Sequence, residues 1–86
     1  MDRRQITFSA HTLDVLEERM IDQEWVQRVV ETPNLLIPDS EDPQLLHALA
    51  PVPENGGRVL RVIYNAEAVP AHVVTAFFDR SARRKI

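Results

Sequence analysis

The segment 58–78 reads RVLRVIYNAEAVPAHVVTAFF, and it decides the fold because it contains the two most β-prone runs in the chain. Residues 58–64 and 71–78 are rich in Val, Ile, Tyr and Phe, which favour strands. Residues 65–70 are few enough for a hairpin connection, and Gly56-Gly57 before the first run can supply the positive φ of a turn. The sequence therefore predicts an antiparallel hairpin in the C-terminal half.

Shorter apolar runs predict further strands upstream of this hairpin. Residues 5–8 alternate in polarity, and residues 35–37 form an apolar run that Pro38 stops. Residues 44–49 have a weaker pattern of the same kind.

Two helices are expected in the N-terminal half. Ser9 can accept hydrogen bonds from the free amides of a helix that runs to about Arg19, and Asp22 can cap a second helix over residues 22–32. In both cases an apolar residue before the cap can pack on one in the following turn. The second helix ends before Pro33, because a residue that precedes proline avoids the α region.

Length and composition allow one folded unit. The 86 residues are 44% hydrophobic and 27% charged, which suits a globular chain with a single core. We therefore expect a single domain over residues 1–86. Its expected fold class is α+β, with an N-terminal αα-hairpin packed on a three- or four-stranded antiparallel sheet.

Several kinds of chemistry are excluded by composition. The chain has no cysteine, so thiolate nucleophiles and the usual structural zinc sites are absent. Its histidines stand isolated at positions 11, 47 and 72, and there is no phosphate-binding glycine loop or nucleophile elbow. We expect neither a metal nor a cofactor. Because there is no long apolar run, we also expect no membrane association and a cytoplasmic location.

The charge is divided between the two halves of the chain. Residues 1–57 carry four arginines against eleven acidic residues, a net charge of −7. Residues 58–86 carry five arginines and one lysine against two acidic residues, a net charge of +4. Two interpretations follow: an anion-binding C-terminal half, or a solvated basic tail beside acidic helices.

Arg61 is the most unusual residue of the predicted sheet. It stands inside a strand whose two faces are both largely apolar, and an unpaired buried charge is costly. One interpretation is an internal salt bridge to an acid such as Glu18 or Asp79, or a side chain that reaches solvent at the sheet edge. The other is a receptor for an anion or phosphate.

Other candidate residues lie at the C-terminus and on the first helix. Arg80, Arg83, Arg84 and Lys85 could contact phosphate, because arginine binds phosphate oxygens in a bidentate manner; the alternative is an exposed tail. His11 and Arg19 fall on the same side of the first helix, where histidine is more often a surface residue than a catalytic one.

The order of these pieces resembles a group of small bacterial domains of unknown function near the RelE/ParE and BrnT toxin superfamily. The resemblance covers most of the chain and rests on FSAH at 8–11, ERMI at 18–21, ETP at 31–33, RVLRVIY at 58–64 and VVTA at 73–76. It implies that Arg61 matches the strand arginine of RelE-like toxins, and that Arg80, Arg83 and Arg84 fall near the basic C-terminal segment of BrnT. The acidic helices depart from the basic helices of such toxins.

The resemblance leads to an expected function. It implies a toxin-like RNA-acting domain, a metal-independent endoribonuclease of a toxin–antitoxin system. Arg61 and Arg80 would hold the scissile phosphate while His11 or Tyr64 moves protons, and Arg19, Arg83 and Arg84 would bind substrate. The partners would be RNA or the ribosome and an antitoxin protein. The alternative is a non-catalytic binding or regulatory module; the sequence does not indicate an oligomeric state.

Overall fold

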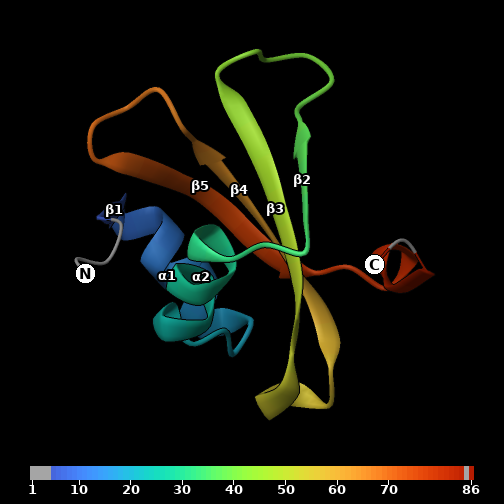
Figure 1. The fold of residues 1–86 in the computed structure, drawn as a ribbon. Helices are drawn as coiled ribbons and strands as arrows, with labels where there is room; N and C mark the ends of the chain where they lie inside the picture. Colours follow the sequence, from blue (N-terminus) through green and yellow to red (C-terminus); the bar gives the residue numbers. More distant parts are fainter. Residues whose placement is uncertain (1–4, 85) are drawn as a thin grey trace.

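The computed structural model describes residues 5–84 and residue 86. Its elements, in chain order, are β1 (Ile6–Phe8), α1 (Ala10–Glu18), α2 (Gln23–Glu31), β2 (Leu35–Pro38), β3 (Leu45–Val52), η1 (Pro53–Asn55), β4 (Arg58–Asn65), β5 (Ala71–Phe78) and η2 (Ser81–Arg84), where η marks a short 3₁₀ helix (Figure 1). Lys85, one of the expected C-terminal cations, lies outside the described residues.

The strands form one mixed sheet in the order β1-β5-β4-β3-β2. β1 pairs parallel with β5, and the other neighbours pair antiparallel. The two helices cover one face of this sheet, while η2 packs against the other face (Figure 1). We call the face that carries η2 the open face.

The expected arrangement, an N-terminal αα-hairpin on a three- or four-stranded antiparallel sheet, is wrong. The sheet has five strands and is mixed, because the strand expected at residues 5–8 joins it as β1 and pairs parallel with β5. β1 can pair parallel with β5 because a long stretch of chain, including both helices, connects them. β3 also continues through Pro51, beyond the expected end at residue 49. There, among the described residues, β3 has a strand on one side only, because β2 begins opposite Leu49, and proline is tolerated in such a position.

Most of the core lies between the helices and the sheet. Trp25 is half-buried and packs against this cluster. Its buried residues include Leu16, Val26 and Val29 from the helices and Leu60, Val62 and Tyr64 from β4. A smaller cluster of Leu49, Val59 and Ala82 lies on the open face and attaches η2 to the sheet.

Both helices begin with the expected caps. The Ser9 hydroxyl accepts a hydrogen bond from the Thr12 amide at 3.0 Å, and the Asp22 carboxylate accepts one from the Glu24 amide at 2.8 Å. These bonds satisfy amides that have no partner within the helix, so local sequence alone places the two helix starts.

The end of α1 is closed by a pair of backbone bonds that require a left-handed residue. The amide of Ile21 donates to the Leu16 carbonyl at 2.8 Å, and the amide of Met20 donates to the Glu17 carbonyl at 3.1 Å. Met20 has φ of 58°, a conformation usually taken by glycine at this place. Its side chain is 83% exposed, so packing does not compensate the strain.

Replacing Met20 with glycine should therefore raise the free energy of unfolding by about 1 kcal/mol, because the backbone strain is relieved while little contact is lost. Urea unfolding measures the change. The control is Glu17→Gly within α1, which should lower stability by about 0.5–1 kcal/mol. A loss of stability in Met20→Gly would contradict this account of the turn.

Candidate functional site

A chain of four polar side chains crosses the open face of the sheet. Arg61 Nε donates to Asp79 Oδ2 at 2.8 Å, and Arg61 Nη1 lies 2.7 Å from His47 Nδ1. His47 Nε2 is in turn 2.7 Å from Asp39 Oδ1. Since arginine can only donate, His47 Nδ1 is the acceptor and Nε2–H faces Asp39. The Arg61–Asp79 contact is the internal salt bridge that the sequence analysis gave as one of two interpretations of Arg61.

Asp79 also holds η2 in place. Its second carboxylate oxygen accepts hydrogen bonds from the Ser81 hydroxyl at 2.7 Å, the Ser81 amide at 3.0 Å and the Ala82 amide at 3.3 Å. The bonds from Ser81 and the ion pair with Arg61 lower the pKa of Asp79 below its usual value of 3.8. Asp79 therefore couples the open face of the sheet to the position of η2.

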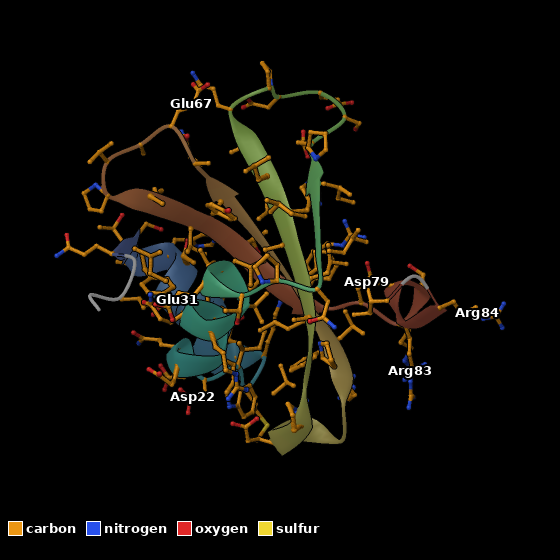
Figure 2. The ribbon with its side chains drawn as sticks, viewed as in Figure 1. Asp22, Glu31, Glu67, Asp79, Arg83 and Arg84 are labelled. Carbon is orange, nitrogen blue, oxygen red and sulfur yellow. The ribbon has the colours of Figure 1, made fainter. Side chains whose placement is uncertain are left out.

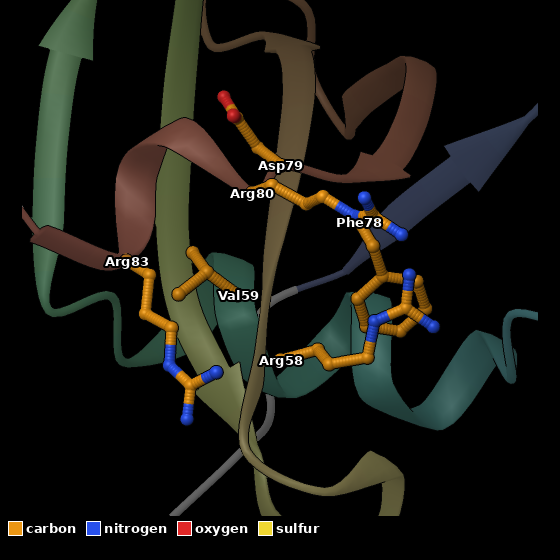
Figure 3. A pocket seen from close by; sticks show the side chains of 6 residues that line it. All are labelled: Arg58, Val59, Phe78, Asp79, Arg80 and Arg83. Carbon is orange, nitrogen blue, oxygen red and sulfur yellow. The ribbon is translucent and has the colours of Figure 1, made fainter.

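Next to Asp79 lies a pocket of about 370 Å³, lined by Arg58, Val59, Phe78, Asp79, Arg80 and Arg83; we call it the arginine pocket. The guanidinium carbon of Arg58 lies 5.0 Å from the centroid of the Phe78 ring, in a cation–π contact. Figure 3 shows the Arg58 and Arg80 side chains extending toward Phe78, while the Asp79 carboxylate points away from them. The Asp79 carboxylate is hydrogen-bonded to Arg61 and to η2, so it does not neutralise the other arginines of the pocket. The pocket therefore has a net positive charge.

A second pocket adjoins the first and shares Arg58 and Phe78 with it. This Trp25 pocket, of about 520 Å³, is lined by Arg19, Met20, Trp25, Asn55, Arg58, Phe77 and Phe78. The Trp25 and Phe78 rings pack in an edge-to-face arrangement, with centroids 6.3 Å apart. Arg19 is anchored nearby, because its Nη1 donates to the Ala76 carbonyl at 2.8 Å.

Acidic residues of the helices and the arginines of η2 lie on opposite sides of the sheet. Asp22 and Glu31 lie on the helical side, whereas Arg83 and Arg84 extend from η2 at the far side of the sheet (Figure 2). Arg80 and Arg84 also line a small hollow with Ser81. The charge asymmetry of the sequence thus becomes a cationic surface around the end of β5.

The residues expected to act together in catalysis do not converge. Tyr64 is 1% exposed in the core on the helix-covered side of the sheet, and Arg61 lies on the opposite face. His11 is an exposed residue of α1 on the helical side. Only Arg80 of the four lines the arginine pocket.

The expected substrate-binding residues lie closer to one another. Arg83 lines the arginine pocket, Arg84 lies in the hollow next to it, and Arg19 lines the Trp25 pocket. Sequence reasoning missed Arg58 and Phe78, which join the two pockets. The signal was present in the hairpin: β4 and β5 pair Leu60 with Phe78, which places Arg58 diagonally opposite Phe78 on the same face.

Neither a metal site nor a membrane helix is found in the part of the chain that the structure describes. No three His, Asp or Glu side chains within residues 5–84 are grouped so that they could hold a metal ion. None of the helices described is long and apolar enough to cross a membrane.

The network around Asp79 predicts how stability responds to acid. Because the pKa of Asp79 is lowered in the folded state, its contribution is complete well above pH 3.8 and is lost as the pH falls below that value. Asp79→Asn should therefore unfold about 1–3 kcal/mol more easily than wild type at pH 7. The difference should shrink toward pH 3, as measured by urea unfolding at both pH values. If the difference in free energy of unfolding between wild type and Asp79→Asn stays constant from pH 7 to pH 3, ionisation of Asp79 is not the source of the stabilisation.

Comparison with known proteins gives one family. Residues 8–78 match the model of the DUF4258 family, described as a domain of unknown function. No curated protein and no solved structure matches the chain. The match provides no link to the RelE/ParE and BrnT toxins, so only the broader part of the resemblance is confirmed. The matched segment includes Arg19, Trp25, Arg58 and Phe78, whereas η2 lies C-terminal to the match. Since it covers most of the sequence, the chain belongs to the DUF4258 family.

Proposed function

We propose that this protein is a non-catalytic binding module that holds the phosphates of RNA in the arginine pocket. The observation that carries the proposal is the arrangement of Arg58, Arg80 and Arg83 around one pocket whose carboxylate, Asp79, is bonded elsewhere. Planar guanidinium groups bind phosphate oxygens in pairs, and several of them together favour a polyanion over a single carboxylate.

The position of the remaining polar groups supports binding over catalysis. Cleavage by the ribose 2′-hydroxyl needs a group that accepts its proton within hydrogen-bond reach. His11 and Tyr64, the expected proton carriers, lie on the helical side of the sheet, and Tyr64 is buried. His47 lies on the open face, but both of its ring nitrogens are engaged, by Asp39 and by Arg61.

The overall charge of −3 limits how strong the interaction can be. Long-range attraction of RNA is weakened by the acidic helices, so affinity must come from the local cluster of arginines. Each phosphate contact contributes about 0.7 to the slope of log affinity against log salt for a single strand. Three arginines would give a slope of about −2.

Fluorescence anisotropy with a labelled RNA oligomer tests the proposal. We expect binding at low salt, with Arg80→Ala and Arg83→Ala each weakening it about fivefold to tenfold and flattening the salt slope by about 0.7. The matched control is Arg28→Ala, which removes the same charge from α2, where Arg28 pairs with Glu54. Equal losses in all three variants would mean that net charge alone acts, and would reject the arginine pocket as the site.

The competing proposal is a metal-independent endoribonuclease related to the RelE/ParE and BrnT toxins, with an antitoxin as partner. The same labelled RNA distinguishes the two. Incubated with the protein and EDTA, it should stay intact if the module only binds, and inducible expression in a bacterial host should neither arrest growth nor cleave transcripts. Cleavage that disappears in His11→Ala would establish the nuclease instead.

A further inference from the structure

The guanidinium group of Arg58 lies over an aromatic ring. Its guanidinium carbon lies 5.0 Å from the centre of the Phe78 ring, and the Phe78 ring packs in turn against Trp25 in an edge-to-face arrangement. Arg58 is nevertheless an exposed residue. The ring therefore covers one side of the guanidinium group, while Arg58 remains accessible from the two pockets that it lines.

The Arg58 side chain lies where the arginine pocket and the Trp25 pocket meet. On one side are Arg80 and Arg83, which suit phosphate oxygens. On the other is the Trp25 pocket, which adds the ring of Trp25 and the exposed side chain of Met20. An anion alone would use the first pocket and leave the second empty, whereas a nucleotide has both a charged and a flat part.

Resting on the proposed function above, we infer that the RNA bound here is single-stranded and that one of its bases stacks on the Arg58 guanidinium at the edge of the Trp25 pocket. Guanidinium planes and aromatic rings are surfaces on which unpaired bases stack. A base inside a duplex has both of its faces covered by neighbouring bases, so a duplex can contact the arginines but cannot occupy the Trp25 pocket.

The strained turn at Met20 fits this arrangement. Its left-handed backbone brings a large apolar side chain to the rim of the pocket with 83% of its surface exposed. Methionine makes favourable contacts with aromatic rings and adapts to their shape. A stacked base would cover this side chain, which the free protein leaves in water.

The single tryptophan of the chain provides a direct probe, because Trp25 lines the pocket that the base would enter. A single-stranded RNA of about eight nucleotides, its duplex form, a base-free ribose-phosphate oligomer and heparin would each be titrated at low salt. We expect a saturable change of Trp25 emission with the single strand only, and about tenfold tighter binding of it than of the duplex or the base-free oligomer.

Two variants separate stacking from charge. Arg58→Lys keeps the positive charge but removes the plane, and should lose both the emission change and the preference for the single strand while still binding heparin. Arg28→Lys is the matched control outside both pockets. It should retain the emission change and the preference for the single strand. Phe78→Leu, which removes the ring beneath Arg58, should resemble Arg58→Lys if circular dichroism shows that it is folded.

The possible results distinguish this inference from the proposed function. Equal binding of single strand, duplex and base-free oligomer, or an Arg58→Lys variant that behaves like wild type, would overturn the stacking of a base and leave phosphate binding intact. Failure of every polyanion, including heparin, to bind would overturn both.

Discussion

The Asp79 carboxylate is the contact on which the candidate site depends. Arg61 brings a positive charge into a sheet whose neighbouring side chains are apolar, and such a charge is tolerated only with a close partner. Asp79 supplies that partner with one oxygen and binds the first turn of η2 with the other. One carboxylate thus pairs with Arg61 and also positions the segment that carries Arg80 and Arg83.

The rest of the site follows from this attachment. Ala82 is buried against Leu49 and Val59, so η2 packs on the open face at the end of β5. Arg80 and Arg83 then lie beside Arg58 in one pocket, although the sequence separates them widely. Because the Asp79 carboxylate is engaged on the other side, it does not neutralise the arginines around it. A structural salt bridge and a cationic pocket are consequently two results of the same arrangement.

The elements that depend on neighbouring residues could be predicted from the sequence. The pairing of strands that are distant in the chain could not. The caps at Ser9 and Asp22 and the hairpin of β4 and β5 are local patterns, and the structure contains them. The parallel pairing of β1 with β5 depends on segments at opposite ends of the chain, and no local pattern reports it. For the site, composition indicated the C-terminal arginines. Arg58 and Phe78 could have been identified only by working out the register of the hairpin.

The central claim is that a ligand phosphate enters the arginine pocket, and an NMR titration of ¹⁵N-labelled protein with a short RNA tests it most directly. The account predicts that the shifted backbone amides and arginine Nε–H signals belong to Arg58, Phe78, Arg80 and Arg83, with those of α1 around His11 unchanged. Shifts centred on α1, or spread evenly over all exposed cations including Arg28, would contradict it.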